Sequence, residues 1–365
     1  MTRLIKPLIA CIFATSLIAA DWPVHRGNSS QTGATSESLP DKLAVRWTFP
    51  TNASIDGGAA IVGQTVFIGS ADGNGYALDL GTGKQKWKFP SGPIKAPVGV
   101  HEGRVFAGND DGAFHCVDAA TGKAIWKFDT GTEVSSGPAF ANDVVLFGTS
   151  DEFVHCLNRT DGKERWKFQV VGGPVLATPL ASDGKVFATG CDSILHAVDL
   201  ANGKETGRLE LGAQVGSAPA MAGGRIFVTH MGGELLAIDA EKLNAAWRFE
   251  GKRREQFFAS PAVGEKMVVI ASREGRVRAI DRTTGKEVWT YLAEKRIDAS
   301  PVIAGNKVYV GSFDRNLYVV DLAKGKEIQK LLLDGVITAS PAISGGCLVI
   351  GTDKGTVYCL AAPNP

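Results

Sequence analysis

A sequence pattern recurs about every 40 residues along most of this chain, and it constrains the possible fold more than any other feature. In its clearest copies, Gly73 to Trp87 and Gly112 to Trp126, a tryptophan follows an aspartate by eight residues. The aspartate slot recurs at intervals of 39 to 42 residues, and its aspartates are Asp79, Asp118, Asp199, Asp239, Asp281 and Asp321. The tryptophan slot holds Trp87, Trp126, Trp166, Trp247 and Trp289, and Trp47 lies forty residues before Trp87 without an aspartate eight residues before it.

Each repeat unit contains four short segments that are typical of β-strands. They are an inner Ala-Ser-Pro-Ala segment, an alternating segment such as Lys307 to Val310, a Tyr-Ala-Leu-Asp segment and a Trp-Lys-Phe segment. The turn between the last two carries a glycine where a hairpin requires a positive φ angle, as at Gly83. The turn at Leu243 and Asn244 lacks this glycine, and there we expect Asn244 to adopt the left-handed conformation.

Four-stranded units of this length that repeat around an axis form a β-propeller. The inner segment occurs eight times, at Ala59, Pro97, Pro138, Pro179, Pro219, Pro261, Pro301 and Pro341. The final unit stops after its third strand, whereas the strand around Trp47 lacks a unit of its own, so the two ends should complete one blade and remove an exposed edge. The sequence therefore predicts an all-β, eight-bladed β-propeller of four-stranded blades with tryptophan-docking motifs, closed by the N-terminal strand. It covers residues 43–365 and follows an N-terminal arm at residues 21–42.

The first twenty residues predict export. Arg3 and Lys6 precede an apolar run that ends in small residues at Ala20, which is typical of a secretory signal peptide at residues 1–20. The residues before Cys11 match the pattern of a lipoprotein cleavage site. Lipoprotein anchoring is nevertheless disfavoured, because Cys11 precedes most of the apolar run. We expect a periplasmic or secreted protein.

The net charge argues against a nucleic-acid or anionic-lipid partner, and the hydropathy argues against a transmembrane helix. Lys and Arg number 39 against 38 Asp and Glu, so the formal net charge of +1 provides no global field for nucleic acid or anionic lipid. No later stretch reaches the length of about 18 apolar residues that a transmembrane helix needs. We therefore expect no nucleic-acid partner and no transmembrane segment, and we take the chain to be a monomer.

The recurring Asp-x-x-Thr-Gly-Lys-x-x-Trp motif, behind a signal peptide, resembles the PQQ-like (pyrroloquinoline-quinone-type) repeats of β-propellers with tryptophan-docking motifs. The mature N-terminus, Asp21 to Gly27, resembles the Trp-Pro-x-x-Arg-Gly leader of many secreted members of that group. The resemblance covers nearly the whole mature chain. It implies the fold more strongly than the function, because the same repeats serve quinoprotein dehydrogenases and the non-catalytic BamB-like branch.

The dehydrogenases of this family carry a vicinal Cys-Cys pair beside the quinone, a calcium ion held by acidic and amide side chains, and a catalytic aspartate. No two cysteines are adjacent in this chain. The comparison favours a protein without catalytic residues, metal or cofactor. The alternative is a PQQ-dependent dehydrogenase, or a degenerate quinoprotein that binds a small ligand at the central channel, with PQQ and calcium as its cofactors.

Cysteines and histidines recur in fixed slots of the repeat, which favours packing over chemistry. Cys116, Cys156 and Cys359 share a slot that is alanine in other units, so we expect small, buried thiols. A neighbouring slot holds tyrosine in three other units and is filled here by His115, His155 and His196. Equivalent side chains on adjacent blades should diverge, and we expect these histidines to pack between blades.

Charged loops that lead into the inner segments remain as candidates for binding. These loops should share one face of the propeller, and rigidly held loops commonly carry binding residues. We predict a site for a protein or other envelope macromolecule that includes Lys95, Arg253, Arg254, Phe257, Arg296 and Asp298. The function expected from the sequence is that of an exported, non-catalytic interaction or scaffold module in the cell envelope.

Overall fold

The computed structural model describes residues 20–251 and 255–363. The predicted signal peptide, up to Ala19, lies outside the described residues, as do Arg253 and Arg254. Within the described ranges all the named secondary-structure elements are β-strands. A search of these residues for helices long and apolar enough to span a bilayer finds none.

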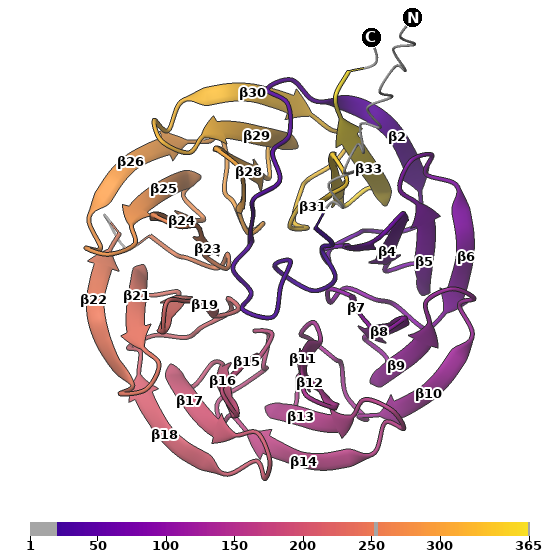
Figure 1. The fold of residues 1–365 in the computed structure, drawn as a ribbon, viewed down its shortest axis with the longest axis vertical. Coiled ribbons are helices and arrows are strands. Elements are labelled where there is room, and N and C mark those ends of the chain that lie inside the picture. Colours follow the sequence, from indigo (N-terminus) through magenta and orange to yellow (C-terminus); the bar gives the residue numbers. More distant parts are fainter. Residues whose placement is uncertain (1–19, 252–254, 364–365) are drawn as a thin grey trace, which may run out of the picture.

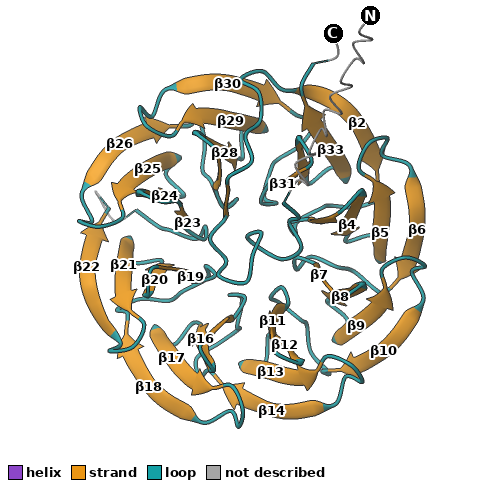
Figure 2. Ribbon diagram, in the orientation of Figure 1, coloured by secondary structure: helices purple, strands orange, loops and turns teal. Residues whose placement is uncertain are grey.

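The strands form eight sheets arranged around a central axis, as Figures 1 and 2 show. Each sheet is one blade with four antiparallel strands, and in blades 1 to 7 these four strands run in chain order from the axis to the rim. The prediction of an all-β, eight-bladed propeller is confirmed.

The strands of blades 1 to 4 follow one another along the chain. Blade 1 holds β3 (Ala60–Val62), β4 (Thr65–Gly69), β5 (Asn74–Asp79) and β6 (Gln85–Pro90). Blade 2 holds β7 (Gly99–His101), β8 (Arg104–Gly108), β9 (Ala113–Asp118) and β10 (Ala124–Asp129). Blade 3 holds β11 (Ala139–Ala141), β12 (Val144–Gly148), β13 (Phe153–Asn158) and β14 (Glu164–Gln169). Blade 4 holds β15 (Leu180–Ser182), β16 (Lys185–Thr189), β17 (Ile194–Asp199) and β18 (Glu205–Glu210).

Blades 5 to 7 continue this order. Blade 5 holds β19 (Ala220–Ala222), β20 (Arg225–Thr229), β21 (Glu234–Asp239) and β22 (Asn244–Glu250). Blade 6 holds β23 (Ala262–Val263), β24 (Met267–Ala271), β25 (Arg276–Asp281) and β26 (Glu287–Leu292). Blade 7 holds β27 (Val302–Ala304), β28 (Lys307–Gly311), β29 (Asn316–Asp321) and β30 (Glu327–Leu332), and β1 (Ala34–Thr35) joins it in parallel beside β27.

Blade 8 is assembled from both ends of the chain. Its inner strands are β31 (Ala342–Ser344), β32 (Cys347–Gly351) and β33 (Thr356–Ala361), and its rim strand is β2 (Ala44–Pro50). β2 pairs antiparallel with β33, with Trp47 opposite Cys359. The first and last colours of Figure 1 therefore meet in one blade. The predicted closure by the N-terminal strand is confirmed, and it covers an edge that β33 would otherwise expose.

Tryptophans of the repeat hold neighbouring blades together. The indole nitrogen of Trp47 donates a hydrogen bond to the carbonyl of Leu80 in blade 1, at 2.8 Å. Its ring lies against Gly83, where an added Cβ would come within 2.6 Å of the indole. Gly83 also has a φ of +71°, so both the turn and the close approach require glycine. Trp87, Trp126, Trp166, Trp247 and Trp289 repeat the arrangement on Gly122, Gly162, Gly203, Gly285 and Gly325.

The two units without this tryptophan are compensated in different ways. Gly207 faces Leu243, whose side chain would lie 2.6 Å from a Cβ added to Gly207 and so occupies the space of the missing ring. Leu243 has a φ of +51°, whereas Asn244 is the first residue of β22, so the prediction of a left-handed Asn244 was wrong. Gln329 instead hydrogen bonds the backbone of Leu43, accepting from its N–H at 2.8 Å and donating to its carbonyl at 2.9 Å.

The aspartates of the repeat stabilise the turns on which the tryptophans dock. Asp79 accepts hydrogen bonds from the backbone N–H of Thr82 at 3.0 Å and from its hydroxyl at 2.8 Å. The same side chain-to-backbone contact recurs at Asp118, Asp199, Asp239, Asp281 and Asp321. An aspartate that bonds the backbone two or three residues on favours a turn, so its place before each glycine is explained by local geometry.

The three histidines of the shared slot lie between blades. Each ring packs against a phenylalanine from the rim strand of the preceding blade, as His196 does against Phe168 with 5.2 Å between ring centroids. The ring nitrogens of His196 lie 2.6 Å from Asp192 and 2.7 Å from Glu205. Burial opposes protonation of His196, but these two carboxylates outweigh it and raise its pKa above the usual value. Burial lowers the pKa of His115, where no such pair of contacts is found in the described chain.

These opposite shifts predict opposite pH dependences for two matched variants. The stability that His196 gains from its carboxylates is fully present below the unfolded pKa of about 6.5 and is lost as pH rises through the higher folded pKa. The melting-temperature deficit of His196→Gln should therefore shrink between about pH 5.5 and pH 8.5. The deficit of His115→Gln should grow over the same range, because a neutral buried histidine loses stability as pH falls. Parallel trends in the two variants would contradict this assignment.

Candidate functional site

The antiparallel blades give the propeller two different faces. One face, here called the loop face, carries the loops from each rim strand to the next blade and the loops between second and third strands. The other, here called the hairpin face, carries the hairpins that join the first to the second strand and the third to the fourth. Lys95, Phe257, Arg296 and Asp298 all belong to loops of the loop face.

Arg296 and Asp298 meet a third residue, Arg273, on the loop face between blades 6 and 7. Arg273 donates to both carboxylate oxygens of Asp298, from Nε at 3.0 Å and from Nη2 at 3.3 Å. Arg296 approaches the same carboxylate at 3.5 Å. The Asp298 side chain is 11% exposed, whereas the Arg273 and Arg296 side chains are 30% and 49% exposed. Two arginines thus present their guanidinium groups around one nearly buried carboxylate.

Two phenylalanines extend this cluster. The guanidinium of Arg273 lies over the ring of Phe258 at 4.6 Å, and that of Arg296 lies over Phe313 at 3.8 Å. We call these five residues, Phe258, Arg273, Arg296, Asp298 and Phe313, the arginine–aromatic patch. Its formal charge is +1, and stacking on the rings holds both guanidinium groups in place. Arginines and aromatic rings in fixed positions are the residue types that contribute most to protein–protein binding.

The structure separates the other residues predicted for this site. Phe257 is completely buried between blades, so the prediction that it contacts a partner is wrong; its neighbour Phe258 is the residue that reaches the surface region. Adjacent residues in extended chain point to opposite sides, which explains the difference. Lys95 pairs with Asp110 at 2.5 Å in the loops of blades 1 and 2. These blades lie across the ring from blades 6 and 7, which carry the patch, as the strand labels of Figure 1 show. Arg253 and Arg254 lie outside the described residues.

The N-terminal arm crosses the hairpin face and reaches the central axis, as the indigo segment of Figure 1 shows. It bonds the inner strands of blades that are far apart in sequence. The carbonyl of Pro23 accepts from the N–H of Val100 at 2.7 Å, and that of Ser30 accepts from the N–H of Met221 at 2.8 Å. The arm then pairs with blade 7 through β1.

Two side chains of the arm bond carbonyls of the inner segments. Arg26 Nη2 donates to the carbonyls of Pro301 at 2.5 Å and Pro261 at 3.3 Å. Gln31 Nε2 donates to the carbonyl of Pro179 at 2.8 Å. Both side chains are nearly inaccessible, and burial lowers the pKa of Arg26 to about 9. Through these two side chains the arm links blades 4, 6 and 7 near the central axis.

The described residues do not fit the quinone and calcium arrangement that the family resemblance suggests for an enzyme. The five cysteines of the described chain are free, and Cys347 and Cys359 are both buried in the core of blade 8. Across residues 20–251 and 255–363, no three side chains of His, Cys, Asp or Glu gather as a metal centre requires. We derive no catalytic step from these residues.

Among curated proteins, the relatives that match parts of the chain include members of two branches. A stretch of 138 residues is 31% identical to quinohemoprotein alcohol dehydrogenase ADH-IIG of Pseudomonas putida, covering 32% of this chain and 19% of that protein. A stretch of 113 residues is 26% identical to outer membrane protein assembly factor BamB of Nitrosomonas eutropha, covering 31% of this chain and 27% of that protein. The matches thus span less than a third of either relative.

Solved structures with the same fold include members of both branches. The crystal structure of BamB from Moraxella catarrhalis superposes with a TM-score of 0.77 at 19% identity, over 88% of this chain and all of that one. Quinohemoprotein alcohol dehydrogenase from Comamonas testosteroni superposes with a TM-score of 0.82 at 13% identity, over 95% of this chain and 82% of that one. At these identities the likeness shows the fold alone.

A family model matches much more of the chain than the curated relatives do. Residues 43–123, 110–206 and 194–364 each match the family described as outer membrane protein assembly factor BamB. Together the three matches cover the propeller from the residue before β2 to the end of β33. The chain belongs to this family of PQQ-like propellers, described as outer membrane protein assembly factor BamB.

Proposed function

We propose that this protein is an exported, non-catalytic interaction module of the cell envelope that binds a protein partner through the arginine–aromatic patch. The observation that carries the proposal is the shared use of Asp298 by Arg273 and Arg296, each stacked on a phenylalanine. Family membership supports a role in protein assembly, and the sequence pattern of the first twenty residues supports export.

The chemistry of the patch defines the partner that suits it. Asp298 neutralises one of the two guanidinium charges, so the second can pair with a carboxylate of the partner. Arg296 is about half exposed and can offer its planar donors bidentately. A partner surface that brings an acidic side chain beside an apolar or aromatic one would satisfy both parts of the patch.

The test is the single variant Arg296→Glu, compared with Arg208→Glu on the rim strand β18. Both changes reverse one charge on an exposed arginine, but Arg208 lies outside the patch. A like charge at an interface costs several kcal/mol, so capture of the envelope partner by Arg296→Glu should fall by at least about tenfold. Arg208→Glu should capture the partner as the parent protein does, and circular dichroism should show that both variants keep the parent fold.

Undiminished capture by a well-folded Arg296→Glu protein would place the binding surface elsewhere. Adding Arg253→Glu and Arg254→Glu extends the test to the two predicted arginines that lie outside the described residues. If only the triple variant loses capture, the contact surface is centred on that loop and not on the patch.

A second candidate function, a degenerate quinoprotein, is favoured by the 31% identity to a quinohemoprotein alcohol dehydrogenase over about a third of the chain. Titration of the purified protein with PQQ and calcium, followed through the melting temperature, separates the two functions. A saturable rise would favour the second function, because a ligand that binds the native state stabilises it.

A further inference from the structure

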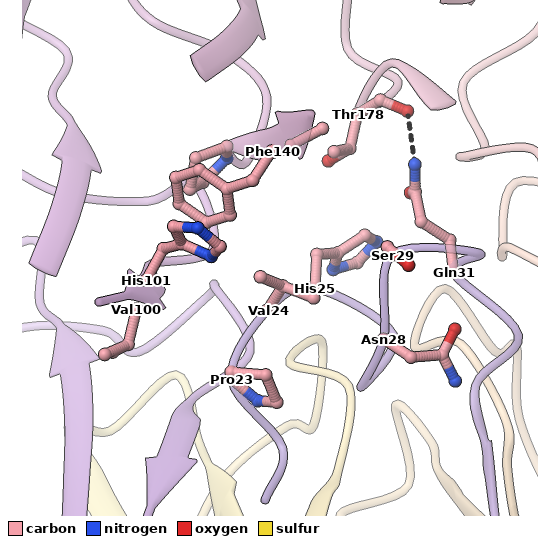
Figure 3. Close-up of a pocket in the computed structure, with 12 residues that line it drawn as sticks. Pro23, Val24, His25, Asn28, Ser29, Gln31, Val100, His101, Phe140 and Thr178 are labelled. Carbon is pink, nitrogen blue, oxygen red and sulfur yellow. Dashed lines mark hydrogen bonds between the residues drawn. The ribbon is translucent and has the colours of Figure 1, made fainter. Parts of the chain in front are cut away.

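A pocket of about 150 Å³ lies on the hairpin face, between the N-terminal arm and the inner strands of blades 2 and 3 (Figure 3). The blades contribute Val100 and His101 from β7 and Phe140 from β11. Gln31 of the arm also lines the pocket. The pocket lies on the opposite face from the arginine–aromatic patch and is independent of it.

The walls of the pocket suit a flat, apolar molecule. The rings of His101 and Phe140 stack with 4.9 Å between centroids and 20° between planes, and they form one side of the pocket. Val24 and Val100 add aliphatic surface and are nearly buried. An apolar cavity of about 150 Å³ is large enough to hold a benzene ring.

The pocket is also electrically neutral. Burial, with a smaller effect from the neighbouring Arg26, lowers the pKa of His25 to about 3. Burial, together with Arg159, lowers the pKa of His101. Both imidazoles are therefore uncharged near neutral pH. The pocket lining, taken over the described chain, includes no Asp, Glu, Lys or Arg, so a charged ligand would find no counter-charge there.

The side-chain amide of Gln31 is held in one orientation by its hydrogen bonds. Its Nε2 donates to the carbonyls of Pro179 at 2.8 Å and Thr178 at 3.4 Å, and because both partners are acceptors the amide cannot be reversed. Its Oε1 is buried and has no hydrogen-bond partner among the described residues. A buried acceptor without a donor is unfavourable, so a ligand that supplies an O–H or N–H group would be bound preferentially.

We propose that this pocket binds a small, neutral aromatic molecule with one hydrogen-bond donor, of the size of a phenol. Its ring lies against the stacked His101 and Phe140, and its donor bonds Oε1 of Gln31, which a small shift of that side chain uncovers. The inference concerns a ligand and goes beyond the proposed protein-binding function, because it uses a different face.

The experiment compares p-cresol with toluene, which differ only by the hydroxyl group, in titrations of the full mature protein followed by NMR. We expect p-cresol to bind about tenfold more tightly, the effect of one hydrogen bond to a buried acceptor. Equal affinities, or the absence of binding by both compounds, would overturn the proposal.

Two variants locate the binding site. Gln31→Met removes the acceptor at similar length, so p-cresol should fall to the affinity of toluene while toluene is unchanged. Ser29 is exposed and lines the pocket, so Ser29→Phe should obstruct it and weaken both ligands without altering the core. Melting temperatures report whether either variant disturbs the arm. A tenfold preference that survives Gln31→Met in a folded protein would overturn the role of Gln31.

A phenolic ring can come from a free small molecule or from a tyrosine of a peptide. N-acetyltyrosinamide, which carries the same ring on a peptide backbone, distinguishes these sources. Binding of p-cresol alone assigns the pocket to a free small molecule, whereas similar binding of both assigns it to a tyrosine side chain.

Discussion

Removal of β2 is expected to abolish the cooperative unfolding of the propeller. Deleting residues 21–50 leaves blade 8 with three strands and exposes the edge of β33 that pairs with β2 in the intact protein. It also removes Trp47, whose ring is nearly buried on Gly83 of blade 1. Loss of a large buried aromatic ring alone costs about 3–5 kcal/mol, and an open strand edge invites pairing with another chain. We expect aggregation and a broad unfolding transition.

A shorter deletion provides the matched control. Deleting residues 21–42 removes the arm but keeps β2 and its contact with β33. This protein should remain monomeric and unfold cooperatively at a lower temperature, because it loses the hydrogen bonds of Arg26 and Gln31 to the inner segments. Size-exclusion chromatography and calorimetry separate the two outcomes. If the 21–50 deletion stays monomeric with an unchanged melting temperature, closure by β2 does not stabilise the ring.

The fold could be predicted from the sequence because each repeated residue meets a local structural requirement of the turn or of the contact between blades. Gly83 is needed for a positive φ and for contact with Trp47, and Asp79 caps the same turn, so these residue types recur at a fixed spacing. The exception at residue 243 could not be predicted from turn chemistry alone. Leu243 occupies the slot of Gly83, where the turn imposes a positive φ, and its side chain fills the space beside Gly207, a contact between blades that only the three-dimensional structure reveals.

The candidate site was predicted only in part. Arg296 and Asp298 follow from the charge of the inter-blade loops, but Arg273 and Phe313 lie in the loops between second and third strands. A signal was present, since three consecutive repeats place a large side chain, Met231, Arg273 and Phe313, in the slot that holds Ala71 in blade 1. The contacts of the arm had no such signal. Its backbone is irregular, and its partners are carbonyls of prolines that are distributed along the whole chain.

A second large effect is expected from breaking a buried ion pair beside the patch. Glu255 is completely buried and accepts from Arg278 at both oxygens, at 2.6 Å from Nη2 and 3.1 Å from Nε. Arg278 occupies the slot that holds Tyr318 in the next blade and also bonds the hydroxyl of Thr290 at 2.8 Å. Each group keeps a second, more exposed partner when the other is removed, since Arg278 also pairs with Glu287 and Arg276 lies 3.4 Å from Glu255. Breaking a buried pair costs about 3–5 kcal/mol when the remaining charge has no other partner, so we expect a loss toward the lower end of that range.

Glu255→Gln and Arg278→Tyr should therefore each destabilise the protein strongly in urea denaturation, whereas the double variant should be more stable than either single one. Tyrosine is the residue that blades 7, 8 and 1 carry in this slot, and glutamine then faces no buried cation. Strictly additive losses would contradict the pairing, because contacting residues are expected to couple. Glu255 lies three residues before Phe258, so the pair also fixes the loop that supports Arg273. Capture of the partner should then fall in Glu255→Gln and recover in the double variant, which would link the buried ion pair to binding at the arginine–aromatic patch.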